Sequence, residues 1–483
     1  MNITKEVNWT QKLSENDVEE VKRLNEIKYD FTTNVKPAFQ TQKGLSREVI
    51  EDMSRDKKEP EWMKNIRLKA LEIFLSKPVP TWGPDLSELN FDELTYYIRP
   101  EDRKANNWEE VPKEIKDTFD KLGVPEMEKK YLAGSVAQLQ SEGVYSRLKK
   151  QWEDKGVIFM DMDSALKLHP DIVREHFGRV VPPSDNKFAA LNTAVWSGGS
   201  FLYIPRGVQL DLPVQAYFRM NGALEGQFER TLIIAEPGAS VHYIEGCTAP
   251  TYSQYSLHAA IVEVYVKNSA KVRYTSVQNW SDNIINGPTK RSWVEENGRM
   301  EWVQGSLGSK ITMTYPSSIL RGEYASTSNL NVALGIGPVW KDNGAKVVHA
   351  APNTSSKVVA KSISGKGGMS VYRGQLRINQ GAYNSKASVQ CDALILDDIS
   401  KSNTYPHNEI LEESASFSHE ASVGKISEEQ VDYLMSRGIR EEDARSLIVL
   451  GFLDDVLKEI PLEYSIEFNK LVKLEMNKYG AVG

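Results

Sequence analysis

The stretch Ala260–Val277, AIVEVYVKNSAKVRYTSV, holds two runs rich in β-branched and aromatic residues around a short polar turn at residues 267–271. Runs of this composition, bounded by turn residues, predict β-strands. A similar unit of two strands around a turn precedes this stretch, and another follows it. When the three turns are aligned on Ala239, Ala270 and Arg299, they recur at nearly equal steps, which predicts a loose structural repeat.

The same pattern of short alternating runs continues from about residue 190 to 425, without a helical period of useful length. A sheet of βαβ units needs crossover helices, and none is visible. The strand pattern alone leaves both a β-sandwich and a β-solenoid open. The stretch is too long for one ordinary sandwich, and its repeat favours a β-helix whose coils bury one continuous core. The predicted fold class is therefore mainly β.

Helical segments flank this region and divide the chain into three expected domains: 1–189, 190–425 and 426–483. Helical spacing marks the first domain at Val18, Val21, Leu24 and Ile27, and again at Trp62, Met63, Ile66, Ala70, Ile73 and Phe74. In the third domain Ser427–Gln430 forms a predicted capping box and Gly438 a helix end. A second helix should carry Ala444, Leu447, Ile448, Phe452, Val456 and Ile460 and stop at Pro461. These helices would cap the ends of the stack.

Composition excludes several classes of function. The 483 residues carry a net charge of −7, which argues against nucleic acid as the main partner. No apolar run approaches the length that spans a bilayer, so no membrane association is expected. The first residues lack the apolar stretch of a signal peptide. We therefore expect a cytoplasmic protein with reduced thiols.

Two enzyme classes find little support. The string Gly365–Gly368 lacks the first glycine of a phosphate-binding loop, so any ATP hydrolysis must come from a partner. A β-helical carbohydrate-active enzyme remains the alternative from another class, and it needs two carboxylates flanking a cleft. Acidic residues are present, but no spacing singles out a pair among Asp397, Asp398, Glu409, Glu412 and Glu413.

The only cysteines are Cys247 and Cys391, too few for a four-cysteine zinc site or a disulfide framework. Either the two cysteines act together chemically, or they are simply two small buried residues. Cys391 is followed by His407, His419 and Glu420 within about the length of one coil, and a coil can bring segments that far apart side by side. Thiolate, imidazole and carboxylate together suit iron. The pattern thus predicts a metal site near Cys391, although a lone histidine is more often structural, and it assigns no role to Cys247.

Several strings together carry a resemblance over nearly the whole chain. They are Tyr131–Gln138, Glu142–Tyr145, Trp196–Phe201, Tyr203–Val208, Glu245–Pro250, Gln390–Asp392, Ser418–Gly424 and Tyr433–Ile439 leading to Gly451 and Phe452. On these motifs the chain resembles the SufB/SufD family of the SUF iron–sulfur cluster assembly system. The resemblance implies a right-handed parallel β-helix with helical N- and C-terminal domains. It also implies a scaffold, not an enzyme, on which nascent clusters are assembled from persulfide sulfur and iron and passed to acceptor proteins.

The resemblance further implies partners and cofactors. An ABC-type ATPase of the SufC type would dock on the C-terminal helices, and a SufD paralogue or a second copy of this chain would pair with the β-helix. Sulfur would arrive from a desulfurase relay. The implied cofactors are a transient iron–sulfur cluster and reduced flavin in the complex. A SufD-like stabilising paralogue is the alternative within the family, but it would lack the sulfur-accepting thiol that this chain retains.

Residue roles follow from the same motifs. Cys247 would accept persulfide sulfur, which requires a depressed thiol pKa or a polar environment. Cys391 and Glu420 would be cluster ligands, with His419 a weaker candidate, so the two cysteines should lie apart. The implied sulfur path consists of Arg219, Asn221, Gln278 and Trp280. An N-terminal cysteine motif of some family members is missing here, because no cysteine precedes residue 247.

Overall fold

The computed structural model describes residues 36–100, 108–121, 132–222, 224–250, 255–454, 458 and 462–477. It is a parallel β-solenoid of about eight turns, with 42% of the residues in strands and helices at both ends of the chain. This confirms the predicted fold class. The helices expected around Val18 to Ile27, and the part of the C-terminal helix at Val456 and Ile460, lie outside the described residues.

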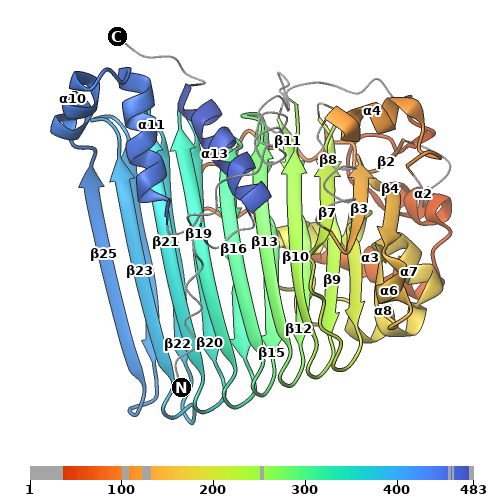
Figure 1. The fold of residues 1–483 in the computed structure, drawn as a ribbon. Helices are drawn as coiled ribbons and strands as arrows, with labels where there is room; N and C mark the ends of the chain where they lie inside the picture. The colour runs from red at the N-terminus through yellow and green to blue at the C-terminus, as the bar shows by residue number, and fades with distance from the viewer. Residues whose placement is uncertain are drawn as a thin grey trace.

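Two sheets form the walls of the solenoid, and in each sheet the strands are stacked side by side, one after another along the solenoid axis (Figure 1). The first sheet has the order β25-β23-β21-β19-β16-β13-β10-β7-β3-β4. Its strands are β3 (Gly134–Leu139), β4 (Glu142–Leu148), β7 (Val214–Arg219), β10 (Ser240–Thr248), β13 (Lys271–Trp280), β16 (Arg299–Gly308), β19 (Ser326–Ile336), β21 (Ser355–Gly365), β23 (Lys386–Ile395) and β25 (Ser416–Lys425). All of its pairs are parallel except β3 with β4.

The second sheet faces the first and has two branches that merge at the long strand β20. One branch contains β5 (Ile158–Asp161), β6 (Ser200–Ile204), β9 (Arg230–Ala235), β12 (Ile261–Val266), β15 (Thr289–Val294) and β18 (Ser317–Leu320). The other contains β8 (Gly226–Gln227), β11 (Ser256–His258), β14 (Ile284–Asn286) and β17 (Ile311–Thr314). Beyond β20 (Trp340–His349) the sheet continues with β22 (Met369–Ile378) and ends at β24 (Lys401–Ile410). A separate small sheet pairs β1 (Phe39–Gln40) with β2 (Ile98–Arg99).

The structure confirms the repeat but corrects the alignment of its turns. Ser240 is in register with Lys271, and Lys271 with Arg299, so Ala270 corresponds to Gly298 and not to Arg299. The coils of the first sheet differ slightly in length, and the step from Arg299 to Ser326 is the shortest between Ser240 and Ser416. Two positions before β10, β13, β16, β19, β21 and β23 the chain takes a left-handed backbone conformation, at Gly238, Ser269, Asn297, Tyr324, Asn353 and Asn384. This tight turn leads the chain from the second sheet into the first.

The main core lies between the two sheets and is built from in-register stacks. Tyr243, Tyr274 and Trp302 occupy equivalent positions of three coils, with ring centroids 5.0 and 5.2 Å apart. Each coil alone would leave its inner face exposed to water, so burial requires its neighbours. Because each coil is buried by its neighbours, no part of the described residues between 240 and 425 forms an independent sub-domain.

Helices and strands mix before residue 190. The N-terminal helices are α2 (Arg47–Lys57), α3 (Glu61–Ser76), α4 (Lys113–Lys121), α6 (Lys150–Glu153), α7 (Met162–Leu168), α8 (Pro170–His176) and α9 (Lys187–Val195). α3 confirms the helical spacing and buries Met63, Ala70 and Phe74. However, β3 pairs with β7 in parallel, so the solenoid sheet already begins at Gly134. All residues of β3 are buried, and it therefore shows no alternation that would mark a half-exposed strand.

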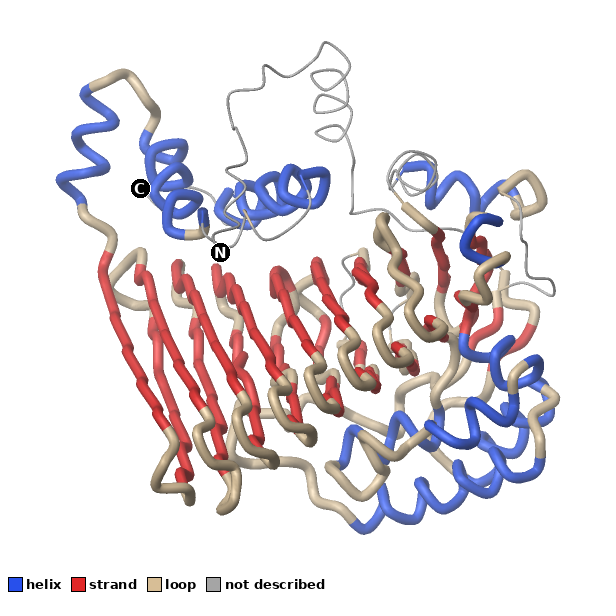
Figure 2. The backbone as a smooth tube through the Cα atoms, turned by 60° about the horizontal axis from the view of Figure 1, so that its bottom comes forward, coloured by secondary structure: helices blue, strands red, loops and turns tan. Residues whose placement is uncertain are grey.

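The C-terminal helices are α10 (Glu428–Ser436), α11 (Glu441–Phe452) and α13 (Leu462–Asn477), and they lie along the outer side of the first sheet (Figure 2). Ser427 caps α10 by accepting a hydrogen bond from the Gln430 amide at 3.3 Å, as predicted. α13 packs Phe468 against Gly305 of β16. No described helix is long and apolar enough to cross a membrane.

Candidate functional site

Cys247 lies inside the solenoid on β10. Parallel pairing with β7 and β13 places it in register with Phe218 and Gln278. Alternate residues of β10 face the space between the sheets, where Val241 and Tyr243 belong to the same core cluster as Cys247. The Cys247 side chain is only 1% exposed. Its thiol therefore faces the protein interior.

Two of the predicted path residues lie on the strands next to β10. Arg219 ends β7, and its Nη1 donates to Thr248 Oγ1 at 3.0 Å, one residue beyond Cys247. Gln278 is the in-register neighbour of Cys247, and its Oε1 accepts from Asn286 Nδ2 at 2.6 Å. Both path residues are buried. Gln278 thus makes the solenoid interior polar beside the thiol, whereas Thr248 and Arg219 lie on the opposite face of the sheet.

The other two path residues lie close by. Trp280 follows Gln278 by two positions on β13, and its ring centroid is 4.6 Å from that of His258. Asn221 follows the end of β7 and is also buried. The structure places all four predicted path residues in the buried part of the coils around Cys247, and their role in sulfur transfer stays a prediction.

A buried charged cluster beside Cys247 was missed by the sequence reasoning. Glu245 precedes Cys247 by two positions on the same face of β10, and its Oε1 lies 3.1 Å from both Lys290 Nζ and Ser276 Oγ. Its other oxygen accepts a hydrogen bond from the Tyr274 hydroxyl. The period-two spacing of a strand is the signal that would have paired Glu245 with Cys247.

A second buried ion pair lies nearby: His258 Nε2 is 2.9 Å from Glu229 Oε2. Burial, together with the negative charges of Glu245 and Glu229, raises the pKa of the Cys247 thiol well above its usual value, and Lys290 opposes this shift. Of the two expectations for this thiol, a depressed pKa is therefore wrong, because desolvation outweighs the single nearby cation. The other expectation, a polar environment around Cys247, agrees with the structure.

Cys391 lies on β23, near the far end of the stack. It is in register with Ala360 of β21 and Ala421 of β25. Its Sγ is 3.6 Å from Nε2 of His419 on β25. Tyr372, on β22 of the facing sheet, hydrogen-bonds to the same sulfur. Strands of both sheets thus converge on this thiol.

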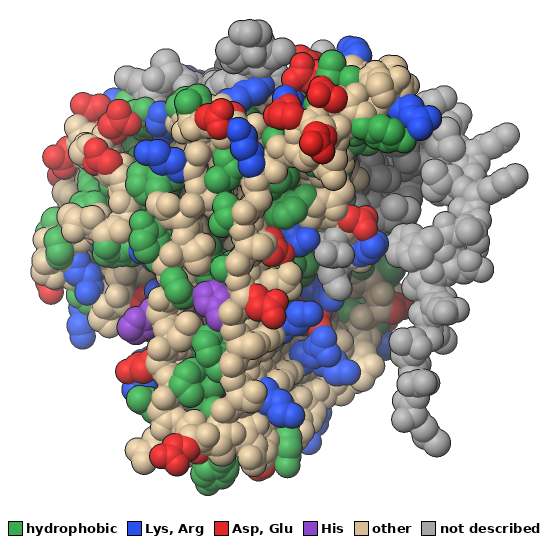
Figure 3. Space-filling view, turned by 90° about the vertical axis from the view of Figure 1, so that its left-hand side faces the viewer, with side chains coloured by type: hydrophobic (Ala, Val, Ile, Leu, Met, Phe, Trp, Pro, Cys, Tyr) green, Lys and Arg blue, Asp and Glu red, His purple; other side chains and the backbone are tan. Residues whose placement is uncertain are grey.

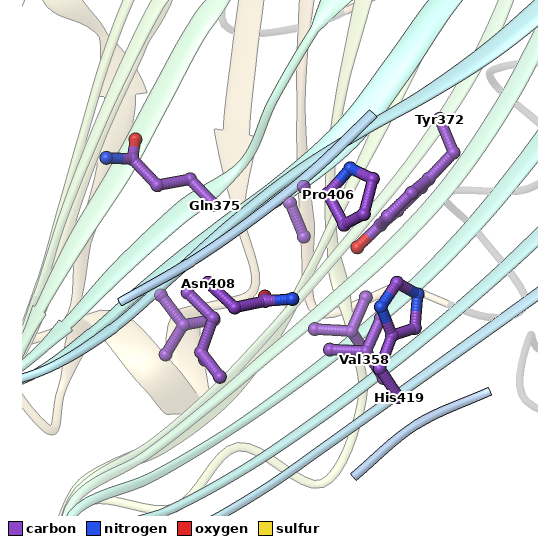
Figure 4. A pocket seen from close by; sticks show the side chains of 11 residues that line it. Val358, Tyr372, Gln375, Pro406, Asn408 and His419 are labelled. Atoms are coloured by element: carbon purple, nitrogen blue, oxygen red, sulfur yellow. The ribbon is translucent and has the colours of Figure 1, made fainter. Parts of the chain in front are cut away.

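The close-up in Figure 4 shows Tyr372 and His419 extending into one narrow pocket between the sheets, which Pro406 and Asn408 of β24 also line. Burial raises the pKa of the Cys391 thiol to about 12, although the Tyr372 hydrogen bond works in the opposite direction. Neither Tyr372 nor its contact with sulfur was anticipated, because no sequence spacing links a residue of one sheet to its counterpart across the core.

Glu420 is placed differently from the other two candidate ligands. It is in register with Gln390, the residue next to Cys391, and both are exposed. Successive strand residues point to opposite faces, so the Glu420 side chain points outward, whereas the side chains of Cys391 and His419 both point inward. The structure therefore brings together the thiol and the candidate judged weaker. Within the described ranges no group of three or more His, Cys, Asp and Glu is placed to hold a metal ion.

The end of the stack next to this site is open. β24 pairs with β22, and β25 with β23, and within the described residues no strand covers their other edges. Exposed apolar side chains on this end are Tyr405, Ile410, Leu411 and Val423. Figure 3 shows this face, with hydrophobic and histidine side chains at the surface. An open parallel edge can add another strand.

The two cysteines lie far apart, as expected. Both are free, and β10 and β23 are separated by five strand spacings. At about 4.8 Å per spacing this is about 24 Å, far beyond the reach of a disulfide.

Two family models and several known proteins match this chain. Residues 48–216 match the family described as SufBD protein N-terminal region, and residues 218–452 match SUF system FeS cluster assembly, SufBD core domain. The chain is 53% identical over 460 residues to the Iron-sulfur cluster assembly protein SufB of Bacillus subtilis, covering 95% of this chain and 98% of the relative. It is also 53% identical, with the same coverage, to an Iron-sulfur cluster assembly SufBD family protein of Staphylococcus epidermidis.

Proposed function

Because the chain belongs to the SufBD family of iron–sulfur cluster assembly proteins, we propose that it is the scaffold of that process. In this proposal Cys247 receives sulfur, Cys391 holds the nascent cluster, and the cluster then passes to acceptor proteins. The observation that carries the proposal is the pairing of Cys391 with His419 beside an open sheet edge.

The donor set suits iron. A cysteine sulfur and an imidazole nitrogen on one face are ligand types found at iron–sulfur centres. The thiol must lose its proton to bind, and a coordinating metal ion deprotonates it. Since the pKa of Cys391 is raised, cluster binding should release a proton from this site. Two ligands leave coordination positions to be filled from elsewhere.

The open edge supports a polypeptide partner that would complete the site. β25 carries His419 and is also the last strand of its sheet, so a chain that pairs with β25 would come next to the ligand pair. A SufD-type paralogue or a second copy of this chain would both offer a β-helix of matching geometry. The partner in this proposal therefore supplies the remaining ligands as well as covering the edge.

The C-terminal helices support an ATPase partner. α10 and α11 expose large apolar side chains at Tyr433, Met435 and Leu447, and α13 exposes Leu474. The sequence has no phosphate-binding loop, so in our proposal a SufC-type ATPase docked here supplies ATP hydrolysis. The chain would then not turn over a substrate by itself. Reduced flavin and a cytoplasmic location stay predictions.

Anaerobic reconstitution with ferrous iron and inorganic sulfide tests the scaffold assignment. The wild-type chain should develop the visible absorption of an iron–sulfur cluster, and Cys391→Ser should lose it. Cys247→Ser is the matched control, because inorganic sulfide bypasses the sulfur acceptor, and it should keep the chromophore. Undiminished cluster formation by Cys391→Ser would refute the ligand assignment.

A further inference from the structure

We propose that Glu245 is the general base that takes the proton of the Cys247 thiol during sulfur transfer, and that Lys290 positions its carboxylate. This inference rests on the proposed role of Cys247 as sulfur acceptor. It assigns a catalytic function to a buried carboxylate that the sequence reasoning left without one.

The geometry is that of a nucleophile and its base. Glu245 and Cys247 are separated by one residue on β10, so both side chains lie on the core face of the strand. Of the charged groups near the thiol of Cys247, the Glu245 carboxylate acts on it most strongly. A base must lie within hydrogen-bonding distance of the proton that it removes. The spacing of two residues on one face of β10 places the Glu245 carboxylate where it can reach the thiol proton.

The carboxylate is held in one orientation by three donors. Lys290 Nζ and Ser276 Oγ lie 3.1 Å from Oε1, and the Tyr274 hydroxyl donates to Oε2. Lys290 Nζ also lies 3.1 Å from Ser276 Oγ and 4.8 Å from the centre of the Tyr274 ring. Although burial by itself favours the neutral acid, Lys290 and the Tyr274 hydrogen bond bring the pKa of Glu245 below its usual value. Glu245 is therefore an ionised proton acceptor at neutral pH.

The thiol, in contrast, needs help to react. The thiolate is the nucleophilic form of cysteine, and burial raises the pKa of Cys247. A neutral thiol beside an ionised carboxylate is the resting state from which a general base acts.

The other ionisable neighbours are less suited to be the base. Charged groups that act on the thiol are Glu245, Glu229 and Lys290, and the phenols of Tyr243 and Tyr274 also lie near it. Glu229 acts on the thiol only through its charge and more weakly than Glu245, and its carboxylate is bound by His258 at 2.9 Å and also by Gln227. Lys290 and Tyr274 donate to Glu245, and Tyr243 forms a 2.7 Å hydrogen bond with Ser200. This leaves Glu245 as the acceptor.

The transfer step balances without an oxidant. Cys247 sulfur attacks the terminal sulfur of a donor persulfide, R–S–SH, while its proton moves to Glu245. The new S–S bond forms as the donor S–S bond breaks, and the departing R–S⁻ takes the proton from Glu245. The products are Cys247–S–SH and R–SH, and the carboxylate is regenerated.

The test uses the full chain with Cys391→Ser, so that Cys247 is the only cysteine. Persulfide formation from glutathione persulfide is followed by mass spectrometry at neutral pH. Glu245→Gln should slow it by about 10²-fold, the typical contribution of a general base. Glu245→Asp, which keeps a carboxylate, should recover part of the rate. Glu229→Gln is the matched control and should be as fast as the parent or faster, because removing a negative charge favours the thiolate.

The sign separates base catalysis from simple electrostatics. If Glu245 acted only through its charge, Glu245→Gln would also react as fast as the parent or faster, and that result would overturn the inference. If the Glu245→Gln variant does not fold, iodoacetamide alkylation of the Cys391→Ser chain still distinguishes base catalysis from electrostatics. With an ionised base the rate should be nearly flat from pH 6 to 8, whereas a rise of about tenfold per pH unit would exclude the base. Alkylation needs no sulfur donor, so a chain that is alkylated in this way but never persulfidated would refute the acceptor role alone.

Discussion

The Sγ of Cys391 and Nε2 of His419 lie 3.6 Å apart on the last two strands of one sheet. The candidate cluster ligands are therefore at the end of the solenoid, on the strands that a partner would extend. A site built in this way is incomplete until the edge is covered. Cluster binding and partner binding should consequently support each other.

Replacing His419 should affect the cluster more than replacing Glu420. His419→Ala removes the nitrogen that faces the Cys391 sulfur, whereas the Glu420 side chain lies on the opposite face of β25 and points away from Cys391. Iron bound per chain and visible absorbance after reconstitution provide the measurement. His407→Ala is the control, because His407 is an exposed histidine on the neighbouring terminal strand β24. Equal losses for His419→Ala and His407→Ala would argue against a ligand role for His419.

A charge on the terminal edge should prevent the proposed pairing. Val423 lies exposed on β25, and Val423→Lys places a cation where another strand would dock. We expect sedimentation to show a smaller assembly, with or without a paralogue present, while the fold remains intact. Leu75→Lys, at an exposed site on α3, serves as the control. An unchanged mass for Val423→Lys would place the interface elsewhere.

The fold could be predicted because its signal is local and repeated. Turn residues and alternating strands recur in every coil, and stacking coils is the only way to bury their inner faces. The start of the sheet at β3 was missed because this strand is buried on both sides, and its sequence therefore does not alternate. The resemblance gave the fold family but no such boundary.

The site could be predicted only in part, for a physical reason. Coil length changes from one coil to the next, so the face on which a residue lies in the next coil cannot be counted from the sequence. For this reason His419 was ranked below Glu420, although His419 is the one that shares the face of Cys391. Contacts across the core, such as Tyr372 with Cys391, carry no spacing signal at all.

An acidic substitution on the C-terminal helices should weaken ATPase binding. Leu447 on α11 is about half exposed, and Leu447→Glu would put a charge into a desolvated contact. Binding to the ATPase partner, measured by calorimetry, should fall by at least tenfold, since burying an unpaired charge costs more than the roughly 1.4 kcal/mol that a factor of ten requires. Leu168→Glu, at another exposed leucine on α7, should bind normally. Normal binding by Leu447→Glu would show that this face does not dock the ATPase.

The stability of the fold should depend on pH through Glu225. Burial raises the pKa of this carboxyl to about 7, although hydrogen bonds from Gln140 and from the Asn221 and Gly222 amides oppose the shift. The folded state therefore holds this proton more tightly than the unfolded state does. Stability from this group is complete below the unfolded pKa and is lost as the pH rises through 7, by roughly 3 kcal/mol for a shift of this size.

Glu225→Gln removes the titrating group but keeps an acceptor for Gln140, which donates to Glu225 Oε1 at 3.0 Å. The variant should be close to the wild type near pH 5 and exceed it at pH 8, as measured by urea unfolding at both values. Glu413→Gln, at an exposed carboxylate, should change neither curve. If wild type and Glu225→Gln showed the same pH dependence, the carboxyl of Glu225 would have to ionise in the folded state as readily as in the unfolded chain. That would contradict the desolvation of this carboxyl beside Gln140 and Thr95, so this comparison tests the packing of that region as well as the titration.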